Sequence, residues 1–201
     1  ADWIATSPST VFFGGAGVST ESGIPDFRGA NGFYFQEREI PLETVLSIDF
    51  FTQHPEAYWE WFHEIYRPVE PNGAHRALAA LEGAGLLDAV ITQNIDGLHQ
   101  RAGSRAVWEL HGNWERLVCT ACGSVAALRD AVTVDGDPVP VCPSCGGQMR
   151  PDIVMYGESL DEAVIEAAVS AIARASTLIV AGTSLVVYPA AGLINYFSGD
   201  H

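Results

Sequence analysis

Four cysteines carry the most specific chemical pattern in the sequence. They form two Cys-x-x-Cys pairs, Cys119 with Cys122 and Cys142 with Cys145. Two such pairs suit a tetrahedral zinc ion in a ribbon-like module, and four thiolate ligands leave no open position for a reacting group. The sequence shows no secretory signal, which favours a reducing compartment and a metal over disulfides. We therefore predict a structural zinc site and a cytoplasmic protein.

A glycine-rich turn is the second candidate site. Gly14, Gly15 and Gly17 come directly after Val11–Phe13, an apolar run with the character of a buried parallel strand. Glycines let the backbone turn tightly and approach a ligand, and the N–H groups of a helix that begins there can bind an anion. The G-x-G pattern alone is weak, because the position three residues after Gly17 is Thr20 instead of a third glycine. We predict a phosphate-binding turn that opens a helix.

The loop after this turn carries three further groups that could contact a ligand. Asp26, Phe27 and Arg28 follow Pro25, which stiffens the loop. A structural corner does not need a carboxylate, an aromatic ring and a guanidinium together, so we expect these side chains to take part in binding. The irregular stretch 29–51 comes next. A loop of this length beside a phosphate site predicts a mobile segment that closes over the ligand.

Polar or small residues stand at the ends of three more predicted strands, 89–94, 107–110 and 177–181. They are Gln93, Asn94, Asp96, His99, His111, Gly112, Gly182, Thr183 and Ser184. Ligands of open α/β sheets bind at the carboxyl ends of the strands. We therefore expect these residues to converge in one crevice, where a histidine could transfer a proton.

The order of strand-like and helix-like segments predicts an α/β fold. Helices are expected at Pro55–Tyr66, at Ala74–Gly83 and from the capping box Ser159–Glu162 to about Ala175, and a strand at Ile153–Tyr156. The alternation predicts a Rossmann-like, mostly parallel sheet with flanking helices, plus a small inserted zinc-ribbon lobe. We expect a main domain of residues 1–115 and 150–201 and a zinc module of residues 116–149. His75 is interpreted as a capping or packing residue.

Composition narrows the class of partner. The chain has 201 residues, of which 48% are hydrophobic, so it can bury a core. No apolar run reaches the length of a membrane span. The net charge is −15, which repels nucleic acid and anionic membranes. We expect no nucleic-acid partner, no membrane partner and a monomer.

Several motifs, in order along the chain, closely resemble the sirtuin family. They are Gly15–Arg28 (GAGVSTESGIPDFR), Thr92–His99 (TQNIDGLH), Glu109–Gly112 (ELHG), the four cysteines and Gly182–Leu185 (GTSL). The resemblance implies an NAD-consuming protein lysine deacylase that releases nicotinamide, O-acyl-ADP-ribose and free lysine.

The resemblance also implies roles for individual residues. His111 and Asn94 would be catalytic, with His111 as the general base, and Phe27 would wall off the reacting face after nicotinamide leaves. Val154, Met155, Tyr156, Gly157 and Glu158 would pair with the substrate peptide by strand addition. The implied NAD contacts, in chain order, are Gly15, Ala16, Gly17, Ser19, Asp26, Phe27, Arg28, Gln93, Asn94, Ile95, Asp96, Gly182, Thr183 and Ser184. The zinc would hold the small lobe in shape.

Two departures from the family pattern bear on this expectation. Sirtuins that remove acidic acyl groups place a tyrosine and an arginine on the helix that corresponds to 55–66, where this chain has Phe62 and Ile65. We therefore expect neutral acyl groups such as acetyl. Family members also continue past Gly199–His201, and the first helix, at Ala1–Ala5, looks clipped, so we expect the chain to be truncated at both ends relative to them.

Three alternatives compete with protein deacetylation. One is transfer of ADP-ribose to protein, which the presence of His111 and Asn94 disfavours. Another is a catalytically weak module that binds NAD or ADP-ribose. The last is a nucleic-acid-binding zinc ribbon, which the charge of −15 disfavours. The expected partner is an acetyl-lysine protein or peptide.

Overall fold

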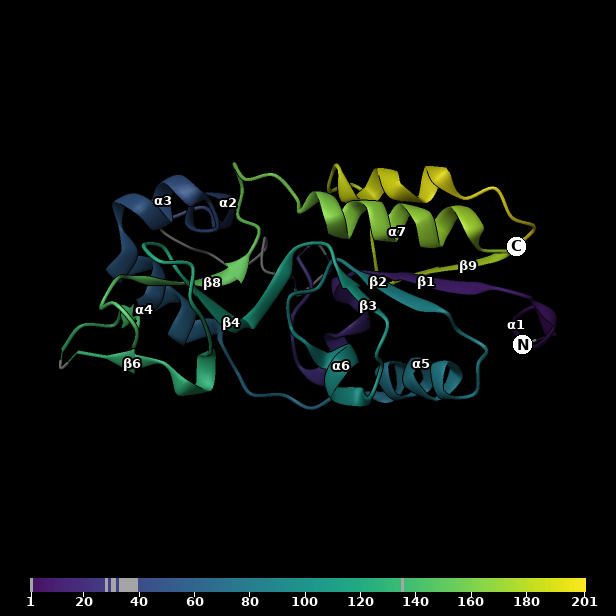
Figure 1. Ribbon diagram of the computed structural model, residues 1–201, viewed down its shortest axis with the longest axis horizontal. Coiled ribbons are helices and arrows are strands. Elements are labelled where there is room, and N and C mark those ends of the chain that lie inside the picture. Colours follow the sequence, from purple (N-terminus) through teal and green to yellow (C-terminus); the bar gives the residue numbers. More distant parts are fainter. Residues whose placement is uncertain (1, 28, 30–31, 33–39, 135) are drawn as a thin grey trace. The chain divides into compact units, whose positions relative to one another are not determined.

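The computed structural model describes residues 2–27, 29, 32, 40–134 and 136–201. Arg28 and most of the predicted mobile segment before residue 40 lie outside these residues. The chain forms two compact units (Figure 1). Unit 1 comprises Ala1–Gln36, Val69–His111 and Leu160–His201, and unit 2 comprises Glu37–Pro68 and Gly112–Ser159. These bounds differ from the predicted domains, because residues 40–68, 112–115 and 150–159 group with the cysteine-bearing segment and not with the parallel sheet.

Unit 1 is built on a parallel sheet of four strands within the described residues. The strands are β1 (Thr10–Gly14), β2 (Ala89–Thr92), β3 (Val107–Glu109) and β9 (Thr177–Ala181), in the order β3-β2-β1-β9. Phe13 of β1 lies in register with Ile91 of β2 and with Val180 of β9. All residues of β1 and β2 are buried, as expected for central strands covered on both faces. The predicted fold class is confirmed.

Helices cover both faces of this sheet. Figure 1 shows α7 (Glu162–Arg174) and the 3₁₀ helix η5 (Ala190–Tyr196) on one side, and α5 (Gly73–Gly83) and α6 (Leu98–Ala102) on the other. The short helix α1 (Asp2–Thr6) precedes β1. On the α5 side, Leu78 packs with Phe12 and Val90 in one buried cluster. The helices therefore leave the strand ends as the place where polar side chains gather.

Local capping explains where two of these helices begin. Asn72 accepts from the backbone of α5, and the side chain of His75 accepts from Asn72 N–H in return, which confirms His75 as a capping residue. At α7 the prediction was wrong in detail. Asp161, and not Ser159, is the N-cap and accepts from Val164 N–H at 3.0 Å. Both side chains can cap a helix, so the pattern alone did not distinguish them.

The helix predicted after the glycine turn is absent from the described residues. The chain forms two 3₁₀ turns instead, η1 (Ala16–Val18) and η2 (Thr20–Ser22). Gly23 then adopts φ +92°, a left-handed conformation that ends the second turn. Because Ser, Thr and Gly are poor helix formers, the segment does not extend into an α-helix.

Unit 2 combines an antiparallel sheet with three helices among its described residues. The strands β4 (Gly112–Cys119), β5 (Val125–Ala127) and β8 (Met149–Ile153) have the order β5-β4-β8, and β6 (Val132–Thr133) pairs with β7 (Pro140–Val141). A short 3₁₀ turn, η4 (Leu128–Asp130), follows β5. The helices are α2 (Leu42–Val45), α3 (Ile48–Gln53) and α4 (Pro55–Ile65).

Two features of unit 2 correct or explain sequence patterns. The strand predicted at Ile153–Tyr156 is wrong, because β8 ends at Ile153. Tyr156 instead forms an isolated bridge with Ser47. Gly112 has φ +78°, and a Cβ there would lie 2.1 Å from the carbonyl oxygen of Asp152 on β8. Glycine is therefore required at this position for the two strands to pair.

The aromatic residues of α4 form the core of unit 2. Tyr58, Trp59 and Phe62 are buried, and the ring of Phe62 stacks on Tyr66 at 5.6 Å. Trp114 of β4 contacts both of these rings edge-on. The predicted helix is confirmed, and its aromatic face is a packing surface. Among the described residues, no helix has the length and apolar character needed to span a membrane.

Candidate active site

Backbone hydrogen bonds draw the strand ends of unit 1 together at one edge of the parallel sheet. Gly17 N–H donates to the carbonyl oxygen of Gly182 at 2.8 Å, which joins the turns after β1 and β9. Gln93 N–H donates to Gly14 at 3.0 Å, and Leu110 N–H donates to Thr92 at 2.9 Å. The four predicted strand-end segments therefore converge at the carboxyl edge, where open α/β sheets bind ligands.

The glycines of this edge are required for the turns to touch. A Cβ on Gly17 would lie 2.8 Å from Cα of Gly182, and a Cβ on Gly15 would lie 2.9 Å from Cβ of Thr183. Gly182 adopts φ +65°, which L side chains rarely take up. No described residue accepts from the backbone N–H of Ala16 or of Ser184. The edge thus offers a close backbone surface with free donors, a chemistry that fits the phosphates of a dinucleotide.

Gln93 connects three of the strand ends. Its side-chain amide donates to Thr183 Oγ1 at 2.9 Å, across the end of β1. Its main-chain carbonyl oxygen lies 2.8 Å from Nδ1 of His111, after β3. One residue therefore fixes both the turn after β9 and the imidazole ring.

The contact with Gln93 sets the tautomer of His111. A carbonyl oxygen can only accept, so Nδ1 of His111 carries the hydrogen and Nε2 keeps its lone pair. Burial lowers the pKa of His111 below its usual value of 6.5, although the bond to Gln93 opposes this. The ring is therefore neutral near pH 7 and has a lone pair on Nε2 that can accept a proton. This is the state that a general base requires.

A buried hydrogen-bond network surrounds Ser19. Its hydroxyl donates to Asp96 Oδ2 at 2.6 Å, because a carboxylate can only accept. The same oxygen accepts from Asn94 Nδ2 at 3.0 Å and lies 3.4 Å from Nε2 of His75. Ser19 is 1% exposed, Asp96 5% and Asn94 8%. The network is therefore shielded from water and holds its members in one arrangement.

The direction of these bonds orients Asn94. Because the single hydrogen of Ser19 goes to Asp96, the group of Asn94 that faces Ser19 must be its NH₂. The side-chain carbonyl of Asn94 consequently points away from the serine. The other oxygen of Asp96 accepts from Leu98 N–H at 3.0 Å, which fixes the carboxylate.

Sequence reasoning missed the support that Asn72 and His75 give to this network. His75 Nδ1 accepts from Asn72 N–H at 3.2 Å, so the hydrogen of a neutral ring is on Nε2, facing Ser19. Burial lowers the pKa of His75, against the field of Asp96, which favours the neutral form. Asn72 also donates to the carbonyl oxygen of Val18 at 2.7 Å. The available signal was an asparagine and a histidine three residues apart at a helix start.

Other predicted cofactor residues take simpler positions in unit 1. Asp26 accepts from Gly29 N–H at 2.8 Å and so shapes its own loop. Phe27 and Ile95 are partly buried. His99, which sequence placed at the same strand end, is 1% exposed and packs edge-on against His75 at 4.7 Å. Burial lowers its pKa to about 3, so it is a neutral packing residue.

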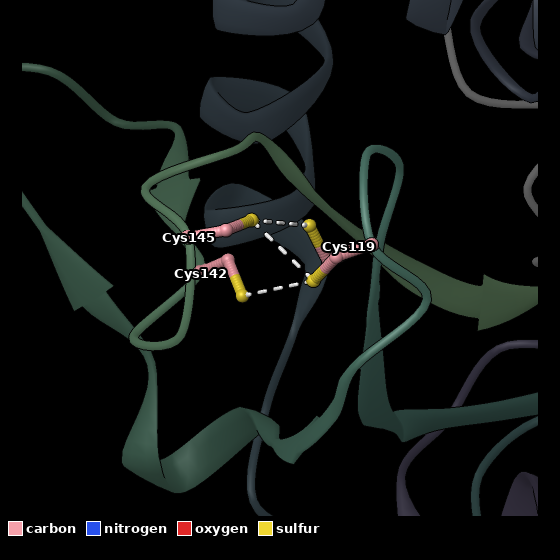
Figure 2. Close-up of side chains that lie close together, drawn as sticks. Cys119, Cys142 and Cys145 are labelled. Carbon is pink, nitrogen blue, oxygen red and sulfur yellow. Dashed lines mark hydrogen bonds between the residues drawn. The ribbon is translucent and has the colours of Figure 1, made fainter.

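The four cysteines of unit 2 form one cluster. Their sulfur atoms all lie within 4.8 Å of one another, and Figure 2 shows the side chains of Cys119, Cys142 and Cys145 with their sulfur atoms directed toward one common point. Sγ of Cys119 is 3.6 Å from that of Cys145, and Sγ of Cys122 is 3.7 Å from that of Cys142. Zn–S bonds of about 2.3 Å in a tetrahedron place sulfurs ~3.8 Å apart. The cluster therefore has the dimensions of a four-thiolate zinc site and excludes disulfides between these pairs.

The predicted peptide-binding residues also lie in unit 2, directly after β8. Met155 is buried, Val154 is partly buried and Tyr156 is 40% exposed. Gly157 adopts φ +94°. The carboxylate of Glu158 does not point outward, because it forms a bidentate ion pair with Arg150. The Nη1–Oε1 and Nη2–Oε2 distances are both 2.6 Å.

The sequence and the fold are similar to those of known proteins. The family model described as "Sir2 family" matches residues 15–189. An "NAD-dependent protein deacetylase" of Clostridium acetobutylicum is 51% identical over 201 residues, covering 98% of this chain and 82% of that protein. An "NAD-dependent protein deacylase" of Aeropyrum pernix is 46% identical, covering 93% and 75%. A solved structure titled "Sir2-p53 peptide-NAD+" is 46% identical with a TM-score of 0.85, covering 97% of this chain and 79% of that one.

Proposed function

The chain belongs to the Sir2 family, and on that ground we propose that it is an NAD-dependent protein lysine deacetylase. It transfers the acetyl group of a lysine side chain in a protein or peptide to ADP-ribose, consuming NAD and one water molecule and releasing nicotinamide and the free lysine amine. The observation that carries the proposal is the arrangement at the carboxyl edge of the sheet. A neutral histidine with a free Nε2 stands one strand away from the buried Ser19–Asn94–Asp96 network.

Each part of the edge has a role in this reaction. Bound NAD supplies the ribose carbon that accepts the acyl oxygen as nicotinamide leaves. The free N–H groups of Ala16 and Ser184 bind its phosphates, and the orientation of Asn94 presents a carbonyl to a ribose hydroxyl. Asp96 and Ile95 hold the nicotinamide carboxamide, while the low exposure of the network keeps water from the reacting carbon.

His111 acts as the general base. Its Nε2 takes the proton of a ribose hydroxyl, so that the hydroxyl oxygen can bond to the former acyl carbon, and addition of water at that carbon then lets the lysine nitrogen leave as the free amine. The Gln93 carbonyl stabilises the resulting imidazolium through Nδ1–H. Phe27 closes the reacting face. The turn at Gly182, Thr183 and Ser184 holds the adenosine side of the nucleotide.

The remaining elements complete the proposed enzyme. The four-cysteine cluster holds a structural zinc ion, which fixes the two knuckles of unit 2. The segment 154–158 binds the acetylated peptide through its backbone, while the Glu158 carboxylate stays paired with Arg150. The acyl group is neutral, since Phe62 and Ile65 offer no cation to an acidic one. We also propose that the protein works in the cytoplasm as a monomer without nucleic acid, in keeping with a net charge of −15.

Mass spectrometry of an acetyl-lysine peptide incubated with the protein and NAD tests the proposal. Deacetylation gives free peptide, nicotinamide and O-acetyl-ADP-ribose in equal amounts. A peptide that gains ADP-ribose would instead indicate an ADP-ribosyltransferase. Binding of NAD without any product would indicate a catalytically weak module.

A further inference from the structure

One ion pair in unit 2 is far less exposed than the other ion pairs among the described residues. Arg150, on β8, and Glu158, eight residues later, have side chains that are only 17% and 25% exposed. The guanidinium forks the carboxylate, with Nη1–Oε1 and Nη2–Oε2 distances of 2.6 Å each. Burial alone would raise the pKa of Glu158, but the hydrogen bonds from Arg150 hold it below its usual value. Both groups are therefore charged in the folded protein, and planar pairing of this kind is strong and directional.

The pair closes the segment between its two members into a fixed turn. Arg150 Nη2 also donates to the carbonyl oxygen of Ile153 at 2.9 Å. Glu158 Oε2 also accepts from Met155 N–H at 2.9 Å, and Glu158 N–H donates back to the Met155 carbonyl at 3.0 Å. The guanidinium lies over the ring of Phe51, 5.8 Å from its centroid. The two side chains thus hold both ends of the turn against the core of unit 2.

The other side of the segment is held by the backbone of the loop between α2 and α3. Tyr156 N–H donates to Leu46 at 2.9 Å, and Ile48 N–H donates to Tyr156 at 3.0 Å. Between these anchors, the N–H and C=O of Val154 bond to no described residue. An extended peptide that adds a strand pairs with just such a residue, through both of its backbone groups.

We propose that Arg150 and Glu158 are positioning residues for the peptide substrate. Their ion pair keeps the backbone of Val154 in the conformation that pairs with an acetylated peptide, and the Glu158 carboxylate itself makes no contact with that peptide. The inference rests on the proposed deacetylase function and concerns its peptide-binding segment. When the pair is broken, only a fraction of molecules has the competent segment, so apparent peptide affinity falls by that fraction. Once peptide is bound, the segment is in place and turnover proceeds normally.

The experiment compares Arg150→Met and Glu158→Gln with the parent. Arg150→Met removes the fork but keeps an apolar stem over Phe51. Glu158→Gln removes the charge but keeps an oxygen for Met155 N–H. Two acetyl-lysine peptides are used, which differ only in an arginine or an alanine beside the acetylated residue. The matched control is Arg116→Ala. It breaks the half-exposed ion pair between Arg116 on β4 and Asp152, which is on β8 like Arg150.

Positioning predicts a KM effect that does not depend on the peptide. Arg150→Met should raise the KM of both peptides about tenfold, and Glu158→Gln should raise both by at least about threefold, with kcat and the KM for NAD unchanged. Calorimetric Kd values for the peptides should rise in parallel, and amide exchange at Met155 should speed up. Arg116→Ala should leave all values within about twofold of the parent, since exposed pairs contribute little.

Two outcomes would overturn the inference while leaving the deacetylase function intact. One is an active parent whose peptide KM is unchanged in both folded variants. The other is a rise confined to Glu158→Gln and to the arginine peptide, which would make Glu158 a direct contact. If Arg150→Met does not fold, Glu158→Gln decides alone by the same criteria. An inactive parent would instead count against the proposed function, and the calorimetric and exchange measurements would still test the role of the pair.

Discussion

Nδ1 of His111 lies 2.8 Å from the main-chain carbonyl oxygen of Gln93, and the side chain of Gln93 donates in turn to Thr183. This contact fixes the tautomer of the proposed base from the backbone, so no carboxylate is needed to orient the ring. It also couples the base to the turn that is proposed to hold the adenosine side of NAD. The state of His111 therefore depends on the packing of strand ends and not on a charged neighbour.

The environment of His111 predicts the acid limb of the rate profile. Burial lowers its pKa below 6.5, so the ring is neutral, and able to act as a base, at pH values where an exposed histidine is already protonated. Activity should therefore be retained as pH falls to 6.5 and should be lost only below it. The measurement is kcat/KM for an acetyl peptide between pH 5 and pH 8. An acid limb centred above pH 6.5 would contradict this assignment.

His75 offers two substitutions that separate its two hydrogen bonds. Glutamine can place an N–H donor near the position of Nε2, toward Ser19, whereas asparagine can place an acceptor near Nδ1, toward Asn72 N–H. Losing the donor frees the Ser19 hydroxyl and loosens Asn94 and Asp96. His75→Asn should therefore weaken NAD binding by about tenfold, in line with one lost buried hydrogen bond, and His75→Gln should weaken it less.

Calorimetric titration with NAD, combined with thermal unfolding, checks the prediction for His75. If His75 acts only as a helix cap, the order of the two NAD affinities is reversed. His75→Asn then keeps the cap and binds NAD more tightly than His75→Gln, which loses the cap. Equal NAD affinity in both variants and the parent would also reject it.

The cysteine cluster should bind one zinc ion per chain. Replacement of Cys142 by alanine removes one ligand and should lower the melting temperature by ~10 °C or more, since structural zinc contributes directly to folding and ~1 kcal/mol shifts the melting temperature by about 2–4 °C at this size. Ser144→Ala is the matched control, because Ser144 is exposed between two of the ligands. Elemental analysis of protein purified without chelator is the measurement. The site would be excluded if the parent contains no zinc and Cys142→Ala melts at the same temperature as the parent.

The acyl preference should favour acetyl over succinyl peptides. Phe62 is 2% exposed within the aromatic core of α4, and neither it nor Ile65 can pair with a carboxylate. Burial of that carboxylate without a partner costs several kcal/mol. Succinyl turnover should therefore be at least about tenfold slower than acetyl turnover, measured on peptides of one sequence. Faster succinyl turnover would show that another residue supplies the missing cation.

The sequence predicted those features that depend on local pattern. The apolar run Thr177–Ala181 coincides with β9, and paired Cys-x-x-Cys spacing brought the thiols into one cluster. The partners of polar side chains were not predictable in the same way. Ser19, His75 and Asp96 are far apart in the chain, and only the folded sheet brings their buried atoms within hydrogen-bond distance.

The segment after β8 shows the same limit. Its apolar residues have strand propensity, yet the chain leaves the sheet at Ile153. The Arg150–Glu158 pair and the backbone of Leu46 and Ile48 hold it in a turn instead. Tertiary contacts therefore override local propensity at this point, as they often do in strands.

The central claim is that His111 is the general base, and His111→Asn tests it most directly. Asparagine can keep an N–H donor to the Gln93 carbonyl while removing the basic Nε2, so the fold should be preserved. The measurement is turnover of an acetyl-lysine peptide with NAD, alongside thermal unfolding of the same samples. We predict an unchanged melting temperature and a loss of turnover of about 10²–10⁴-fold. A variant that melts like the parent and keeps its turnover within about tenfold would contradict the claim.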